Sequence, residues 1–119
     1  MAKIGIYGVS SQSGVAFLSD LLSEGEHVYG YARPTDHGRA AVDAIRRQHG
    51  VQVDRPENEL NEESHFVNLG DSEVGHDLKR LACTSELIVF AHPAHYHEET
   101  ARQLAPYLAR IDEAVPIVL

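Results

Sequence analysis

Cysteine is nearly absent from this chain of 119 residues, which contains only Cys83. A single cysteine excludes an internal disulfide framework and a zinc site made of several thiolates. Cys83 lies in an apolar stretch between a predicted helix and a predicted strand. We therefore expect a buried, inert thiol.

Long apolar segments and basic residues are also scarce. No segment approaches the roughly 20 apolar residues of a membrane-spanning helix, and Met1 to Lys3 lead into a predicted strand without a signal-peptide pattern. We expect a cytoplasmic protein with no membrane partner. Lys and Arg number 10 against 18 Asp and Glu, and the resulting net charge of −8 argues against nucleic acid as a partner.

Apolar patterns predict strands that alternate with helices along a single domain. Strands are expected at residues 3–8, 27–32, 87–91 and 115–119, and helices at residues 14–24, 37–48, 72–82 and 97–110. In the first helix, Phe17 and Leu18 share the predicted inner face. The alternation favours βαβ units, so the predicted fold class is α/β, with a doubly wound, mostly parallel sheet and helices on both faces.

Two features complicate this pattern. Residues 51–53 and 65–69 alternate like strands and predict a hairpin at the edge of the sheet, and the acidic residues 54–64 between them are interpreted as a solvated loop. Pro106 lies inside the last predicted helix, where it is expected to kink the helix or to shift its start.

A glycine-containing turn, Gly8-Val-Ser-Ser-Gln-Ser-Gly14, follows the first strand and opens the first helix. We call residues 8–14 the phosphate turn, because this is the context of the dinucleotide fingerprint in Rossmann-type domains. The helix N-terminus there attracts a pyrophosphate. One glycine of the fingerprint is missing, since serines stand in the middle of the turn; a turn that binds no nucleotide is therefore the alternative. The predicted pyrophosphate-binding residues are Gly8, Ser10, Ser11, Gln12, Ser13 and Gly14.

The end of the second predicted strand bears on the choice of nucleotide. NAD-selective domains place an acidic residue there, which binds the ribose 2′-hydroxyl. This sequence has Arg33 instead, and Arg39 follows in the next helix. Guanidinium groups form bidentate, charge-assisted hydrogen bonds with phosphate. We therefore predict NADP rather than NAD as the cofactor, the alternative being that both arginines are solvated surface charges.

Three histidines, His92, His95 and His97, follow the predicted strand 87–91. In a doubly wound sheet this loop lies beside the first strand, where ligands bind. A metal site formed by the histidines and the glutamates after them is an alternative, although the spacing fits no established zinc pattern. The remaining histidines are interpreted as surface residues. The predicted lining of the nicotinamide end of the site consists of His92, Pro93, Ala94 and His97.

The stretch from Leu87 to Leu108 resembles the octopine/nopaline (opine) dehydrogenase family. Members have a similar apolar strand, then Pro-Ala-x-x-His, then a helix ending in a Leu-Ala-Pro-x-Leu-like segment, as in Pro-Ala-His-Tyr-His and Leu-Ala-Pro-Tyr-Leu here. The phosphate turn and Ala32-Arg33 also fit. Arg33 with a basic residue at position 39 is similar to the NADPH-using opine-metallophore branch. The resemblance covers essentially all 119 residues, as the N-terminal domain of the family.

This resemblance implies an NADP-dependent oxidoreductase that condenses an α-keto acid reductively with the amine of an amino acid or a similar compound. By resemblance, the phosphate turn holds the pyrophosphate, Arg33 and Arg39 hold the 2′-phosphate, and Pro93, Ala94 and His97 lie near the nicotinamide. The family's catalytic His–Asp pair belongs to a C-terminal helical domain, so no catalytic residue and no metal ligand is assigned in this chain.

The end of the sequence and its exposed surface lead to two further expectations. Because the sequence stops as a strand begins, residues 1–119 are expected to be an NAD(P)-binding fragment that is inactive alone. Apolar surface exposed on such a fragment would allow a homodimer. A free-standing NAD(P)-binding regulatory or sensor module is the alternative function.

Overall fold

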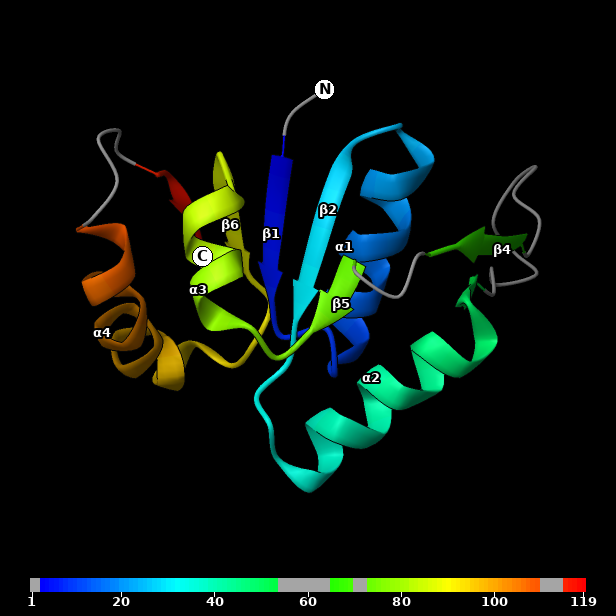
Figure 1. The fold of residues 1–119 in the computed structure, drawn as a ribbon, viewed down its shortest axis with the longest axis horizontal. Helices are drawn as coiled ribbons and strands as arrows, with labels where there is room; N and C mark the ends of the chain where they lie inside the picture. Colours follow the sequence, from blue (N-terminus) through cyan, green and yellow to red (C-terminus); the bar gives the residue numbers. More distant parts are fainter. Residues whose placement is uncertain (1–2, 54–64, 70–72, 110–114) are drawn as a thin grey trace.

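The computed structural model describes residues 3–53, 65–69, 73–109 and 115–119 (Figure 1). Five strands form one sheet in the order β5-β2-β1-β6-β7, and every neighbouring pair is parallel. Because β1 has β2 on one side and β6 on the other, the chain changes direction across the sheet at β1. The strands are β1 (Lys3–Tyr7), β2 (His27–Tyr31), β5 (Val74–Gly75), β6 (Leu87–Phe90) and β7 (Ile117–Val118).

Helices cover both faces of this sheet, which confirms the predicted α/β, doubly wound class. They are α1 (Gln12–Ser23), α2 (Asp36–Gln48), α3 (Leu78–Thr84) and α4 (His97–Leu108). No helix in the described part of the chain has the length and apolar character needed to span a membrane.

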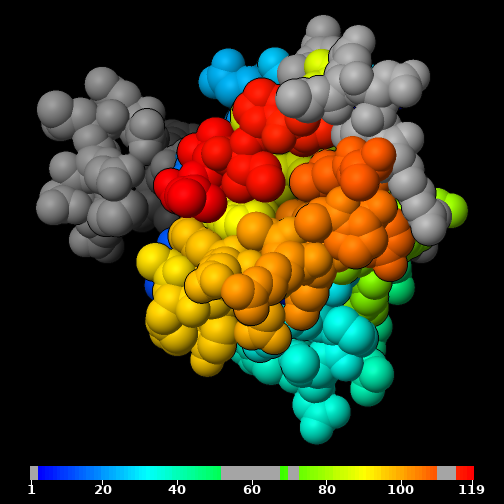
Figure 2. All heavy atoms as spheres, turned by 90° about the vertical axis from the view of Figure 1, so that its left-hand side faces the viewer, coloured from blue at the N-terminus to red at the C-terminus, as the bar shows by residue number. Residues whose placement is uncertain are grey.

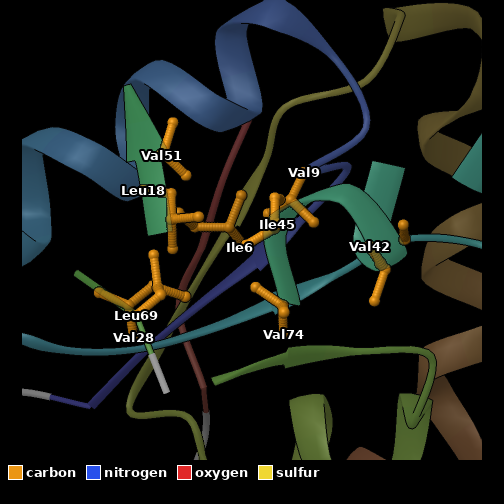
Figure 3. Close-up of a cluster of buried hydrophobic side chains, with 10 residues drawn as sticks. Ile6, Val9, Leu18, Val28, Val42, Ile45, Val51, Leu69 and Val74 are labelled. Carbon is orange, nitrogen blue, oxygen red and sulfur yellow. The ribbon is translucent and has the colours of Figure 1, made fainter. Parts of the chain in front are cut away.

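Two apolar cores lie on opposite faces because successive side chains of a strand point to opposite sides. On one face, Ile6 of β1 packs with Leu18 of α1 and Val42 of α2 (Figure 3). On the other face, the next residue, Tyr7, belongs to a core with Leu81 of α3 and Leu104 of α4. The helices before β5 thus pack on one face, and those after it on the other.

The prediction of a helix over residues 72–82 is wrong in its first half. Val74 and Gly75 form β5 and pair with Gly30 and Tyr31 at the end of β2. The helix α3 begins only at Leu78, because the Asp77 side chain caps it by accepting a hydrogen bond from the Arg80 amide at 3.0 Å. Helical periodicity hid the short strand, since two residues are too few to show strand alternation.

The predicted hairpin is present, but it does not lie at the edge of the main sheet. β3 (Gly50–Val53) and β4 (His65–Asn68) form an antiparallel pair of their own. β5 occupies the position beside β2 instead. The acidic segment 54–64 falls outside the described residues.

Two predicted burial patterns are wrong, and Pro106 does not shift the start of the last helix. Phe17 is 46% exposed, although Leu18 beside it is fully buried. Cys83 is exposed, because Leu81 and Ala82 are the residues that α3 turns inward. Pro106 is accommodated in the final turn of α4, which starts at residue 97 as predicted and ends at residue 108.

We expect the two neighbouring apolar residues of α1 to differ in their effect on stability. Leu18→Ala should lower the free energy of unfolding by about 3 kcal/mol, because it leaves a cavity in the core. Phe17→Ala should lower it by less than about 1 kcal/mol, because the ring is largely exposed. Urea denaturation of the two variants tests this, and equal losses would support the inward Phe17 predicted from periodicity.

Candidate nucleotide-binding site

The phosphate turn leaves β1 through a backbone conformation that favours glycine. Gly8 has a φ of +111°, and its amide and that of Val9 both donate to the Tyr31 carbonyl at the end of β2, at 2.8 and 3.1 Å. Gly14, the first buried residue of α1, lies against the Gly8 carbonyl, where any Cβ would collide. Both glycines therefore do what the fingerprint requires of them.

Ser11 connects the phosphate turn to the loop after β6. Its Oγ lies 2.7 Å from the Gly8 carbonyl oxygen and 2.8 Å from the Ala91 carbonyl oxygen, and it accepts a hydrogen bond from the Gly14 amide at 3.0 Å. The Ser11 hydroxyl is thus engaged within the protein. Because the cap already occupies the Gly14 amide, the amides of Gln12 and Ser13 are the groups that the first turn of α1 offers to an anion.

The phosphate turn is the first wall of the site, and the segment between β2 and α2 forms the second. Thr35 caps α2 by accepting a hydrogen bond from the Gly38 amide at 3.1 Å, and the exposed Arg33 precedes it. His37, in the first turn of α2, has its Nε2 at 3.2 Å from the Ser10 carbonyl oxygen. This contact brings the start of α2 against the phosphate turn.

The third wall consists of residues 92–97, which contain three histidines, and of α4. The 3-10 helix η2 (Ala94–Tyr96) leads into α4. His92 Nε2 lies 2.8 Å from the buried Thr100 Oγ1, and His97 Nε2 lies 3.0 Å from the His92 carbonyl oxygen. The His92 ring packs 4.6 Å from the Tyr7 ring, centroid to centroid. These contacts fix the loop after β6 to the first turns of α4.

These three walls enclose a cavity of about 290 Å³ at the carboxyl ends of β1 and β2. We call it the main cavity. Figure 2 shows the orange surface of α4 with the cyan surface of the segment after β2 directly below it. His92 and Pro93, which follow β6, also line this cavity, so it borders the switch point between β1 and β6, where ligands of doubly wound sheets bind. The cavity is lined by Tyr7, Gly8, Ser10, Ser11, Arg33, Thr35, His37, His92, Pro93, Tyr96, Glu99, Thr100 and Gln103.

A second, more open hollow of about 440 Å³ adjoins the main cavity. Both share Ser11, His92 and Pro93 among their lining residues. The second hollow extends along α1 to Ser13 and to the exposed ring of Phe17. The phosphate turn therefore lies between two connected hollows, one beside Arg33 and one beside Phe17.

Burial controls the protonation of Tyr7 and His92, which line the main cavity, and of Tyr31, whose ring lies 4.8 Å from that of Tyr7. It raises the pKa of Tyr7, and it raises the pKa of Tyr31 to about 12, with a further contribution from Tyr7. Burial also lowers the pKa of His92, and the nearby His97 lowers it further. The tyrosines are therefore neutral hydroxyls at neutral pH, and His92 is favoured as the neutral imidazole.

The structure brings about half of the predicted site residues together in the main cavity. Ser13 lines the second hollow, and Gln12 and Gly14 lie in the first turn of α1. Arg39, Ala94 and His97 line neither hollow. Arg39 is exposed on α2, Ala94 is exposed in η2, and His97 packs against His92. The predicted residues that meet in the main cavity are Gly8, Ser10, Ser11, Arg33, His92 and Pro93.

Several lining residues were not predicted from the sequence. His37 was interpreted as a surface residue, yet it lines the main cavity while being exposed. On α4, Glu99 and Gln103 are one turn apart, so their spacing predicts that they share one side of the helix, but it does not predict which other elements that side meets. Within residues 3–53, 65–69, 73–109 and 115–119, no group of three His, Cys, Asp or Glu side chains is placed to hold a metal ion.

The solved structures that this chain resembles include those of two enzymes. Yersinopine dehydrogenase matches with a TM-score of 0.77 and 12% identity, over 100% of this chain and 28% of that one. Octopine dehydrogenase in a structure with NADH and pyruvate matches with a TM-score of 0.66 and 19% identity, over 91% of this chain and 27% of that one. A structure of octopine dehydrogenase with NADH and L-arginine gives a TM-score of 0.62 at 20% identity.

The chain shares its fold with one part of these dehydrogenases. It spans about 28% of the length of yersinopine dehydrogenase and about 27% of that of octopine dehydrogenase. No protein-family model and no curated protein sequence matches the chain. At these identities the likeness establishes the fold, and the function has to be argued from the site.

We expect His92 to make stability depend on pH below neutrality. The unfolded chain protonates this imidazole near its ordinary pKa of about 6.5, whereas burial in the folded chain lowers that pKa. The unfolded state then binds more protons, so the stabilisation from neutral His92 is present above about pH 6.5 and is lost as the pH falls toward the folded pKa.

Urea denaturation between pH 5 and pH 8 measures this effect. The His92→Gln variant should lose stability less steeply with falling pH than the native chain. His95→Gln, a change at an exposed residue of the same segment, should follow the native curve. Parallel curves for the native chain and His92→Gln would show that His92 does not contribute.

Proposed function

We propose that this chain binds NADP(H) as the cofactor domain of an opine-type dehydrogenase. The observation that carries the proposal is the shared cavity: Arg33 lines the same hollow as Gly8, Ser10 and Ser11, at the switch point of the sheet. A dinucleotide with a 2′-phosphate needs both an amide-rich helix start and a nearby cation.

The residues fit the parts of the dinucleotide in order. The amides of Gln12 and Ser13 face the pyrophosphate, where the N-terminus of α1 adds its partial positive charge. Arg33 and the Thr35 hydroxyl meet the adenosine ribose and its 2′-phosphate. Arg39 lies in the first turn of α2, from which its long side chain reaches the same phosphate from outside. In a chain of net charge −8, an arginine that lines the cavity beside the start of α1 supports an anionic ligand.

The nicotinamide half occupies the second hollow. It leaves the phosphate turn on the side of Ser13, and Phe17 and Pro93 supply apolar surface for its ring. His92 and Pro93 line both hollows and lie where the two nucleotides join. Ala94 and His97 support this loop from behind, His97 through its contact with the His92 carbonyl.

The nicotinamide supplies a hydride when it is bound, and the chain contributes its position and orientation. The proposed reaction of the whole protein is the reductive condensation of an α-keto acid with an amino-acid-like amine. Its support is the fold shared with octopine dehydrogenase, which has been solved with NADH and pyruvate and with NADH and L-arginine. Residues that hold these substrates against the cofactor are proposed to lie in another domain, so this chain alone is expected to be inactive.

Removal of the Arg33 charge should weaken NADPH binding selectively. In the Arg33→Gln variant we expect the Kd for NADPH to rise about 10- to 100-fold, because hydrogen bonds to charged groups contribute about 1.5–3 kcal/mol. The Kd for NADH should change less than about 3-fold, since NADH has no 2′-phosphate. Calorimetric titration with each dinucleotide measures both constants.

Arg47→Gln is the matched control, because Arg47 is exposed in the last turn of the same helix that begins after Arg33. It changes the net charge equally and should leave both constants unchanged. An equal loss of NADH and NADPH binding in Arg33→Gln would refute the proposed contact between Arg33 and the 2′-phosphate. If the native chain bound neither dinucleotide, the proposal that this chain binds the cofactor by itself would be refuted.

A further inference from the structure

A carboxylate lines the main cavity, although the ligand proposed for it is a polyanion. Glu99 projects from the first turn of α4 into the same cavity as Arg33. No salt bridge joins Glu99 to a basic side chain among the described residues, whereas its neighbour Glu98 pairs with Arg102 at 2.7 Å. A carboxylate near phosphates is unfavourable, so its place in the cavity calls for a ligand group that donates hydrogen bonds.

Gln103 lies one helical turn after Glu99 and lines the same cavity. Residues four apart on a helix project side by side. The Tyr7 hydroxyl donates to Gln103 Oε1 at 3.3 Å, and burial keeps that hydroxyl protonated by raising the pKa of Tyr7. The Gln103 oxygen accepts this hydrogen bond, and the amide NH₂ of Gln103 is the group that remains as a donor for a ligand in the cavity.

Together, Glu99 and Gln103 place an acceptor beside a donor. The Watson–Crick edge of adenine has the complementary order, an N6 amino donor beside the N1 acceptor. Hypoxanthine and guanine have the reverse order, an O6 acceptor beside an N1–H donor. With Glu99 facing position 6 of the purine and Gln103 facing N1, the pair matches adenine and opposes the 6-oxopurines.

The position of this pair also fits the base. In doubly wound domains the adenosine ribose lies at the end of the second strand, which here is Arg33. The Tyr96 ring is 42% exposed, lines the cavity, and has the Arg33 guanidinium 5.7 Å from its centre. Bases stack on aromatic rings and on guanidinium planes. A base attached to a ribose at Arg33 thus reaches Tyr96, and beyond it the polar side chains of α4.

We propose that Glu99 and Gln103 recognise the Watson–Crick edge of adenine and make the site selective for adenine dinucleotides over 6-oxopurine dinucleotides. This inference rests on the proposed function, because it assigns the base of the same dinucleotide. Glu99 accepts from the N6 amino group, and Gln103 donates to N1. Tyr7 positions Gln103 through its hydrogen bond to Oε1.

The test compares NADPH with its hypoxanthine counterpart, nicotinamide hypoxanthine dinucleotide phosphate in reduced form. The native chain should bind NADPH at least about 10-fold more tightly, since a site that hydrogen-bonds an NH group discriminates against its replacement. In Glu99→Gln the ratio of the two dissociation constants should fall toward about 1, because the new amide can also donate to O6. Gln103→Met, which removes the donor, should lower the ratio as well.

Glu98→Gln is the control, since it removes the same charge from the neighbouring, 79% exposed residue of α4. It should leave the ratio at the native value. If Glu99 acted only through its charge, Glu99→Gln would strengthen both ligands equally and leave the ratio unchanged, which would overturn the inference. Equal binding of both dinucleotides to the native chain would overturn it too, while leaving the proposed function intact. Binding of neither would refute the proposed function, and the inference with it.

Discussion

The hydrogen bonds of the Ser11 hydroxyl are the constraint on which the site depends. Its oxygen accepts from the Gly14 amide, and its single O–H lies within hydrogen-bond distance of both the Gly8 and the Ala91 carbonyl oxygens at the carboxyl end of the sheet. A glycine at this position of the fingerprint would allow a closer backbone approach but would not make this connection. The phosphate turn and the loop after β6 therefore keep a fixed spacing, and both hollows, which share Ser11, keep their shape.

Polar groups surround this connection in an order that suits a dinucleotide. Arg33 supplies positive charge on one side of the turn, and α1 directs its free amides to the middle. Tyr7 and His92 line the cavity in their neutral forms, because burial disfavours the charged ones. These two side chains thus add no negative charge where the phosphates are proposed to bind, and among the described lining residues the carboxylate, Glu99, lies on α4.

The likeness to yersinopine and octopine dehydrogenases at 12% and 19% identity shows how little of the sequence the fold needs. Alternating apolar strands and amphipathic helices suffice to build the two cores. The site needs more, namely particular residues at the strand ends. The phosphate turn and Arg33 could be predicted, because each directly follows a strand in a recognisable local pattern. The site residues of α4 could not be predicted, because they reach the cavity only through the packing of Leu104 against the sheet.

Local patterns in the sequence determined the parallel α/β sheet, the glycine turn and the arginine after the second strand. Tertiary structure decided the features that depend on two distant segments. Pairing with β2 made Val74 and Gly75 a strand. Of the two neighbouring residues Phe17 and Leu18, only Leu18 is buried against the sheet, and Phe17 is largely exposed to solvent. Contact with Ser10 brought His37 to the cavity. A hydrogen bond joins Gln103 to Tyr7, which is 96 positions away in the sequence. The physical reason is that periodicity fixes which face a residue takes on its own element. Which other elements meet that face is decided only when the two cores pack.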